Sequence, residues 1–289
     1  MPQATDAEFK IPKGVPDLRR PNKVRKYIED GGDLERTEVT WGGFTMLAEA
    51  ARRGYGETTQ MLLEANANVN AVNYAGQSVL VSRCSITDDT HGDVASICSL
   101  LLKHGAEVNY SDANGLTSLT NVLMASGSQQ VVALLLAHKA DANHVISQPT
   151  LINVLERTEG LSPLATAARA GRVDLVIMLL HARADVELGS RSALHLACES
   201  GCIASLDVLL SRCSSAIARI DESGFTPLIV ACRKANYEVA KMLLTRGAVV
   251  NALDLQGRSA LLSIGLDAHE GASRVALADL LLLHGADAS

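Results

Sequence analysis

The chain has 289 residues, of which 47% are apolar and only 3% aromatic, and its formal net charge at pH 7 is −6. This mild negative charge gives no overall electrostatic footprint for nucleic acid. No N-terminal stretch resembles a signal peptide, no apolar run reaches membrane-spanning length, and the six cysteines show no disulfide framework spacing. These features predict an intracellular protein, in the cytoplasm, the nucleus or both, that does not contact a membrane.

The N-terminal end differs from the rest of the chain in charge. Residues 1–26 contain seven Lys or Arg and three Asp or Glu, and four of the seven prolines lie in residues 1–21. This composition predicts a flexible basic tail over residues 1–21. Residues 22–40 have the pattern of a second helix and a turn without a first helix. They predict a partial repeat that caps a single array over residues 22–289.

After residue 40 one pattern recurs seven times: a leucine two residues after a Ser or Thr, a Leu-rich pair further on, and a Gly-Ala-Asp-like turn. The opening leucines are Leu47, Leu80, Leu119, Leu164, Leu194, Leu228 and Leu261. A repeat of about 33 residues predicts a stack of short units, because no unit can bury its apolar face alone. The units are predicted at residues 41–72, 73–110, 111–144, 158–187, 188–219, 220–252 and 253–289, with a long finger insertion at 145–157.

Each unit is predicted to start its first helix at a Ser or Thr that fits an N-cap. These residues are Thr45, Ser78, Thr117, Ser162, Ser192, Thr226 and Ser259. Pro227 follows one cap at the first helical position, where its missing N–H costs nothing. A longer second helix then runs from about Glu238 to Gly247. Asparagines are expected to satisfy backbone groups of the closing turns; they are Asn70, Asn109, Asn143 and Asn251.

Several of these segments resemble the ankyrin repeat. They are Gly224-Phe-Thr-Pro-Leu, Ser192-Ala-Leu-His-Leu-Ala, Leu101-Leu-Lys-His-Gly-Ala-Glu-Val-Asn109, Leu243-Leu-Thr-Arg-Gly-Ala-Val-Val-Asn251 and Leu281-Leu-Leu-His-Gly-Ala-Asp287. The resemblance implies an all-α ankyrin-repeat solenoid, a stack of α-α hairpins with about seven full repeats and a partial N-terminal capping repeat. It also implies that the turn tips form fingers and that the first helices line a concave surface.

The sequence departs from this family in two respects. The histidine that follows the opening leucine occurs only as His195, so stiffness between turns is expected to be lower than in a consensus array. Extra residues lie around Thr87–Gly92, Val145–Leu155 and His269–Ser273. These insertions are either recognition loops or neutral loop elongations.

No catalytic or cofactor signature is found: the sequence has no phosphate-binding loop, nucleophile elbow or His-Glu-x-x-His motif. His195, Cys198, Cys202 and Cys232 could in principle supply zinc ligands. Cys198 and Cys232 occupy a repeat position that holds alanine in other units, which favours small buried core residues instead. We therefore expect no catalytic residue, no cofactor and no metal, and expect that the chain is not an enzyme.

The fingers and the ends of the first helices carry the predicted partner-binding residues. They are Trp41, Phe44, Arg52, Arg53, Tyr74, Arg169, Arg191, Phe225, Arg233, Lys234 and Arg258. Aromatic residues and arginine are enriched in binding hot spots, and a stripe of cations would attract an anionic segment. Two other interpretations stay open. The arginines are solvated and cover apolar surface with their stems, or Trp41 and Phe44 pack as part of the cap.

The predicted function is that of a scaffold or adaptor that recognises a partner protein or an acidic peptide through the concave finger and first-helix surface. One alternative is binding of an anion or nucleic acid by the basic tail and the arginine stripe, which the net charge disfavours. Another is the regulatory or substrate-recruiting part of a larger enzyme whose catalytic domain lies outside this chain. The apolar segment Val275–Leu283 leads us to expect that the C-terminal repeat contacts a further domain or subunit.

Overall fold

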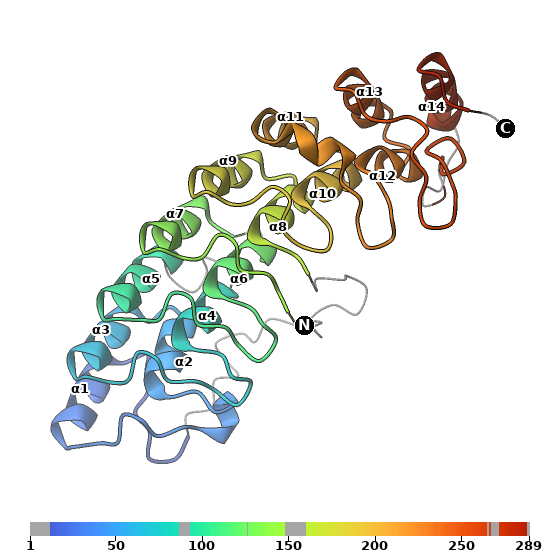
Figure 1. Ribbon diagram of the computed structural model, residues 1–289. Helices are drawn as coiled ribbons and strands as arrows, with labels where there is room; N and C mark the ends of the chain where they lie inside the picture. The colour runs from blue at the N-terminus through green and yellow to red at the C-terminus, as the bar shows by residue number, and fades with distance from the viewer. Residues whose placement is uncertain are drawn as a thin grey trace. The chain divides into compact units, whose positions relative to one another are not determined.

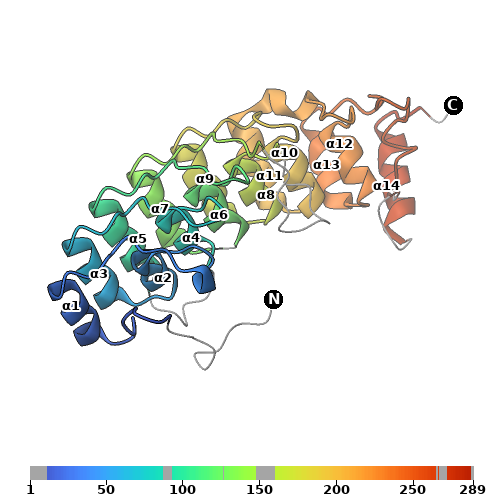
Figure 2. The ribbon, with the colours of Figure 1, turned by 90° about the horizontal axis from the view of Figure 1, so that it is seen from below.

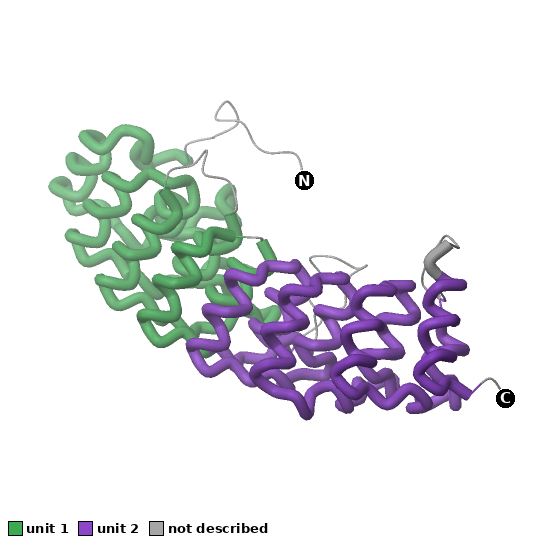
Figure 3. The backbone as a smooth tube through the Cα atoms, turned by 90° about the horizontal axis from the view of Figure 1, so that it is seen from above, with its two compact units in different colours: residues 1–141 green, residues 142–289 purple. Residues whose placement is uncertain are grey.

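The computed structural model describes residues 12–86, 93–125, 127–147, 160–264, 266 and 272–287. Within these ranges the chain forms helices joined by turns, and the β-type pairings are two isolated bridges, Glu38 with Phe44 and Val72 with Ser78. The chain divides into two compact units, Met1–Asp141 (unit 1) and Ala142–Ser289 (unit 2), which are coloured separately in Figure 3. Of the predicted insertions, residues 87–92, 148–157 and 269–271 lie outside the described ranges.

Unit 1 consists of helix pairs stacked side by side (Figure 1). One row holds the first helices α2 (Met46–Arg52), α4 (Val79–Cys84) and α6 (Ser118–Met124), and the other holds the second helices α3 (Gly56–Glu64), α5 (Val94–Lys103) and α7 (Gln129–Ala137). Helix α1 (Pro21–Glu29) packs on α3, and a short 3-10 helix covers Val39–Trp41. The opening leucines are buried where the two rows meet, so the predicted apolar spacing builds the core.

Unit 2 repeats this arrangement, as the second view in Figure 2 also shows. Its first helices are α8 (Pro163–Arg169), α10 (Ala193–Ser200) and α12 (Pro227–Arg233), and its second helices are α9 (Val173–His181), α11 (Ile203–Arg212), α13 (Tyr237–Thr245) and α14 (Ala272–Leu283). A 3-10 helix, Ser214–Ala218, follows α11 and packs on it. The predicted all-helical hairpin array is confirmed in both units.

Five of the predicted N-caps are made as expected. The side chains of Thr45, Ser78, Thr117, Ser162 and Thr226 accept hydrogen bonds from backbone N–H groups in the first turn of the next helix. Ser192 differs, because its hydroxyl bonds to the ring of His195. These caps fix where the first helices begin, and therefore where their C-terminal ends and the neighbouring fingers lie.

The last predicted helix start, Ser259, is not followed by a helix. The described residues 260–264 form turns, although the Ser259 hydroxyl still accepts from the Leu262 N–H at 3.4 Å. Short helices depend on packing for their stability. Leu262 is 64% exposed, whereas Ile229, in the equivalent place of α12, is fully buried. The prediction of a helix here was wrong because packing on this side is missing.

The turn asparagines satisfy backbone groups as expected, but the groups that they bind belong to the turn of the following repeat. Asn109 donates from Nδ2 to the Lys139 carbonyl at 3.1 Å, and its Oδ1 accepts from the Asp141 N–H at 2.8 Å. The same pair of bonds is made to the next turn by Asn70, Asn143 and Asn251. Each asparagine therefore links two consecutive turns.

Replacing Asn109 with alanine is expected to lower the free energy of unfolding of unit 1 by about 1 kcal/mol, because two exposed hydrogen bonds between turns are lost. Urea denaturation followed by circular dichroism measures this change. Gln130→Ala, at an exposed position of α7, is the matched control and should change stability by less than about 0.5 kcal/mol. Equal effects of the two substitutions would mean that the link between turns carries no free energy.

The described part of the predicted basic tail is folded. Val15 and Leu18 are buried, and Thr58 of α3 donates from its hydroxyl to the Leu18 carbonyl at 2.8 Å. Arg19 donates to Asp17 at 2.9 Å, and this hydrogen bond holds the pKa of the Asp17 carboxyl below its usual value. The prediction of a flexible tail over residues 1–21 is therefore wrong for residues 12–21. The prediction gave more weight to the charge and proline content of this segment than to its two apolar side chains, Val15 and Leu18, which are buried in the structure.

Candidate functional site

Trp41 lies inside the molecule and not at the tip of a finger. The residue ends the short 3-10 helix and is only 7% exposed. Gly42 and Gly43 follow with φ of 69° and 83°, so the chain reverses in a conformation that glycine adopts without strain. A buried indole offers no surface to a partner, and the prediction of Trp41 as a contact residue is therefore wrong. The alternative, that it packs within the N-terminal part of the array, fits its burial.

Tyr74 and Phe44 are accessible in unit 1. Tyr74 is 67% exposed, and its ring lies close to Gly43, where a Cβ would come within 2.4 Å of a ring carbon. Phe44 is half-buried, and the guanidinium of Arg52 lies over its ring, 5.7 Å from the centroid. The structure therefore gathers Phe44, Arg52 and Tyr74 in one region of unit 1.

Arg52 and Arg53 both bind a buried carboxylate of their own helix. Glu49 is fully buried, and it accepts from Arg52 at 2.9 and 3.0 Å and also from Arg53. A charge-assisted bidentate pair of this kind fixes both side chains. These two arginines are therefore not an uncompensated basic patch. Glu49 was missed from the sequence, although arginines three and four residues after a glutamate in a helix are the usual signal of such pairs.

In unit 2 the corresponding finger and helix ends surround a hollow of about 220 Å³. Its lining residues are Arg191, Glu199, Asp221, Ser223, Phe225, Val230, Arg233 and Lys234. Arg191 comes from the finger before α10 and Glu199 from the end of α10. The others come from the finger between α11 and α12, from α12 and from the residue that follows it. The Arg233 guanidinium lies 4.5 Å from the centre of the Phe225 ring. Four predicted residues, Arg191, Phe225, Arg233 and Lys234, are thus brought together around one concave feature.

Ion pairs hold the walls of this hollow. Glu199 accepts from Arg191, and its other oxygen lies 3.2 Å from Lys234 Nζ. Burial alone would raise the pKa of Glu199, but the charges and hydrogen bonds of Arg191 and Lys234 outweigh it, so the pKa lies below its usual value. The carboxylate is therefore ionised at neutral pH and keeps both cations in place.

The finger that carries Phe225 is held in position from two sides. Asp221 Oδ1 accepts from the N–H groups of Ser223 and Phe225, both at 2.9 Å, which closes the turn. His195, fully buried in α10, donates from Nε2 to the Phe225 carbonyl at 2.9 Å, and its Nδ1 accepts from the Ser192 hydroxyl at 2.8 Å. A carbonyl can only accept, so Nε2 carries a proton, and burial lowers the pKa of His195, which favours the neutral Nε2–H tautomer at neutral pH. The single repeat histidine therefore positions the aromatic residue of the hollow.

The remaining predicted residues lie apart from this hollow. Arg169, at the end of α8, is half-buried. Arg258 donates to Asp254 at 2.8 Å and to Gln256 at 3.0 Å within its own finger. Five of the predicted cations each pair with a carboxylate of this chain; they are Arg52, Arg53, Arg191, Lys234 and Arg258. The predicted basic stripe is therefore largely neutralised, which the spacing of the arginines alone did not reveal.

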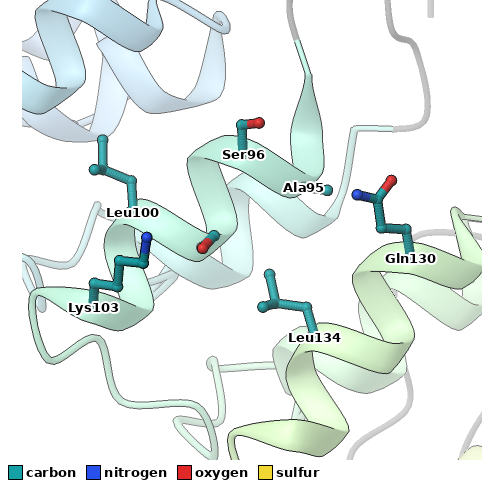
Figure 4. Close-up of a pocket in the computed structure, with 7 residues that line it drawn as sticks. Ala95, Ser96, Leu100, Lys103, Gln130 and Leu134 are labelled. Atoms are coloured by element: carbon teal, nitrogen blue, oxygen red, sulfur yellow. The ribbon is translucent and has the colours of Figure 1, made fainter.

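A second hollow of about 410 Å³ lies in unit 1, between α5 and α7 (Figure 4). Small side chains such as Ala95 and Ser96 line it on α5, and Gln130 and Leu134 line it on α7. Lys103 is its one charged lining residue. It therefore lacks the paired charges and the aromatic ring that mark the hollow of unit 2.

The cysteine and histidine cluster has the character of core packing. Burial raises the pKa of the Cys198 thiol far above its usual value and that of Cys232 to about 12. Neither thiol is ionised at neutral pH in this environment, as is usual for a small apolar side chain in a core. Both nitrogens of His195 are engaged in hydrogen bonds. In the described part of the chain no three His, Cys, Asp or Glu residues are grouped as a metal site would require.

Comparison with known proteins identifies the repeat. A family model described as ankyrin repeats (3 copies) matches residues 47–146, 90–190, 147–215 and 187–254. The human ASB11 ankyrin repeat domain, a solved structure, is similar with a TM-score of 0.65 and 26% identity, over 84% of this chain and 99% of that one. The chain belongs to the ankyrin-repeat family. The solenoid fold implied by the sequence is thereby confirmed.

Among curated ankyrin-repeat proteins, the ankyrin repeat and KH domain-containing protein mask-1 of Caenorhabditis elegans is 28% identical over 87% of this chain. The nuclear factor NF-kappa-B p105 subunit of Gallus gallus is 30% identical over 53%. The chain spans only 9% and 15% of the length of these two relatives. Ankyrin repeats are in general protein–protein interaction modules. No helix among the described residues is both long and apolar enough to cross a membrane.

Proposed function

We propose that this ankyrin array is a non-enzymatic scaffold whose partner protein docks on the finger and first-helix surface of unit 2, centred on the hollow beside Phe225. The observation that carries the proposal is the grouping there of an aromatic ring, a stacked guanidinium and two ion-paired cations. Aromatic residues and arginine dominate binding hot spots when they lie in well-defined pockets. Because Glu199, Asp221 and His195 hold the walls, little side-chain entropy is lost on binding.

The same proposal covers a smaller contact area in unit 1. It consists of Phe44, Arg52 and Tyr74, of which Tyr74 is the most exposed. Arg53 binds Glu49, the carboxylate that also binds Arg52, and so helps to fix the position of Arg52. Trp41 is not part of this contact area. Arg169 and Arg258 are peripheral contacts of the unit 2 surface. An intracellular location is part of the same proposal.

The test compares partner capture by the wild-type chain, by Phe225→Ala and by Lys241→Ala, which changes an exposed residue of α13. Proteins retained from a cell extract are quantified by mass spectrometry, and the affinity of the most enriched one is then measured with purified components. Phe225→Ala should weaken binding at least tenfold, because it removes the ring on which Arg233 is stacked. Lys241→Ala should leave binding unchanged. Equal affinity of all three chains, with unchanged circular dichroism, would disprove docking at this surface.

The alternative of anion or nucleic-acid binding makes a different prediction. Its affinity would fall steeply with salt, because phosphate contacts release counterions. The pairing of Arg52, Arg53, Arg191, Lys234 and Arg258 with carboxylates of this chain leaves few cations for such contacts. Partner recognition through Phe225 is therefore favoured, and a salt titration of the captured complex separates the two.

The C-terminal face is included in the proposal as the contact for a further domain or subunit. In α14, Leu282 is partly exposed and Leu283 is largely exposed. Leu244, which takes the place of Leu282 in the preceding repeat, is buried. A helix with apolar side chains on more than one side needs a second cover. The role of this array as part of a larger enzyme stays an alternative prediction.

A further inference from the structure

Helix α14 has one apolar face that is buried in unit 2 and a second apolar face that is exposed. It packs beside α13 at the end of the row of second helices (Figure 1). Its buried side chains are Leu277, Leu280 and Leu281, whereas Val275, Leu282 and Leu283 are exposed. Leu283 is 85% exposed. A helix with two apolar faces needs cover on both sides.

The exposed residues of α14 form one continuous stripe. Val275, Ala276, Asp279, Leu282 and Leu283 are spaced i, i+1, i+4, i+7 and i+8, which places them on one face of an α-helix. Asp279 lies at the centre of this stripe and is its one charged residue. Within the described residues its carboxylate forms no ion pair and no side-chain hydrogen bond. The stripe is therefore apolar at both ends and negatively charged in the middle.

The position of Leu283 shows that a further stacked repeat would not cover this stripe. Leu283 directly follows the leucine pair of its helix, as Thr245 does in α13. Thr245 is exposed although α14 packs beside α13. The other second helices also have an exposed polar or small residue in this place: Glu64, Lys103, Ala137, His181 and Ser211. A further repeat in the same register would cover Leu282 and leave Leu283 in water.

We propose that the exposed stripe of α14 binds an amphipathic helix of a partner protein, with large aliphatic side chains on both sides of a central Lys or Arg. This inference rests on the C-terminal contact that the proposed function includes, and it names the chemistry of the partner there. Val275 and Leu283 are eight residues apart, which is about 12 Å along the helix axis. A helix packed along α14 covers both ends of the stripe at once.

The charge of the stripe decides what has to lie opposite its centre. The partner helix removes Asp279 from water, and a carboxylate that loses water without a counter-charge opposes binding. A Lys or Arg at the middle of the partner stripe supplies that counter-charge. The aliphatic side chains before and after it then contact Val275 at one end and Leu282 with Leu283 at the other.

A second copy of this chain does not fit the stripe in the same way. When two α14 helices pair so that their stripes overlap fully, Asp279 of one copy faces Asp279 of the other, in parallel and in antiparallel pairing alike. Like charges that face each other across an interface disfavour the complex. The charge of the stripe therefore selects a partner with a cation over a second copy.

Two synthetic peptides test this inference. The first is acetyl-Gln-Ala-Gln-Leu-Leu-Ala-Gln-Lys-Ala-Gln-Leu-Leu-Gln-Ala-Gln-amide, whose leucines and lysine repeat the spacing of the stripe. The second has Glu in place of Lys, and circular dichroism checks that the two have equal helix content. Binding to the full chain is measured by the shifts of the backbone amide NMR signals of residues 275–283.

The Lys peptide is expected to bind roughly fivefold more tightly than the Glu peptide, because attraction to Asp279 replaces repulsion. Asp279→Lys should reverse this preference. Glu238→Lys makes the same change of charge at an exposed position of α13 and should retain the preference. Leu283→Ser should weaken the binding of both peptides, because it removes the most exposed apolar contact of the stripe.

Absence of binding, equal binding of both peptides, or an unchanged preference in Asp279→Lys would overturn the inference. Sedimentation of the wild type as a dimer that Leu283→Ser converts to a monomer would also overturn it, because the stripe would then belong to a second copy.

Phe225→Ala should bind the Lys peptide as the wild type does, which separates this contact from docking at the hollow. If neither peptide binds while Phe225→Ala weakens partner capture, docking at the hollow stands and this inference falls. If the Lys peptide binds but Phe225→Ala leaves capture unchanged, docking at the hollow falls and the contact on α14 remains.

Discussion

Replacing Glu49 with alanine should lower the free energy of unfolding of unit 1 by about 2–3 kcal/mol. The substitution leaves Arg52 and Arg53 without the buried carboxylate that binds both of them. Removing one partner of a fully buried pair costs about 3–5 kcal/mol. The side chains of Arg52 and Arg53 are 34% and 17% exposed, so water recovers part of that loss.

Urea denaturation of the wild type, Glu49→Ala and Glu49→Gln measures this effect. The glutamine variant retains shape and one acceptor and should lose less, about 1–2 kcal/mol. Glu29→Ala, at an exposed end of α1, controls for the removal of a negative charge and should change stability by less than about 0.5 kcal/mol. A loss in Glu49→Ala no larger than in this control would contradict the assigned ion pair.

Replacing His195 with alanine should destabilise unit 2 by about 2–4 kcal/mol, because it creates a cavity and removes two buried hydrogen bonds. The Phe225 carbonyl and the Ser192 hydroxyl would lose their shared partner. His181→Ala, at the exposed end of α9, is the matched control. The finger that carries Phe225 should also become more mobile, which faster amide hydrogen exchange at Phe225 would report. Unchanged exchange would show that Asp221 alone orders the turn.

The wild type should also lose stability as the pH falls below about 6.5. Burial is the main cause that lowers the pKa of His195 below its ordinary 6.5, and it outweighs the hydrogen bond to the Phe225 carbonyl. The unfolded chain therefore binds a proton at a higher pH than the folded one, so protonation favours unfolding in the window below 6.5. This part of the pH dependence should be absent from His195→Ala. An identical pH profile of both chains between pH 5 and 7 would contradict it.

The sequence predicted residues that form the candidate site, but it did not predict which of the charged residues are already paired. Phe225, Arg233 and Lys234 could be placed on one surface because the cap at Thr226 sets the register of the helix that follows the finger. The carboxylate that pairs with Lys234 could not be placed, because Glu199 lies in one repeat and Lys234 in the next. For Lys234 it is this contact between consecutive repeats that pairs the cation. Trp41 was misplaced for a related reason, since its burial depends on how the chain reverses at Gly42 and Gly43.

The sequence by itself determined the family, the helical hairpins and most helix starts. These depend on periodic apolar residues, caps and turn glycines within each repeat. The tertiary structure decided which of the predicted surface residues are accessible and charged. It buried Trp41, joined Leu18 to α3, left residues 260–264 without a helix and formed a hollow lined by Phe225 and Arg233. Burial and the ion pair between Glu199 and Lys234 arise from packing between consecutive repeats, and a pattern read within one repeat does not contain them.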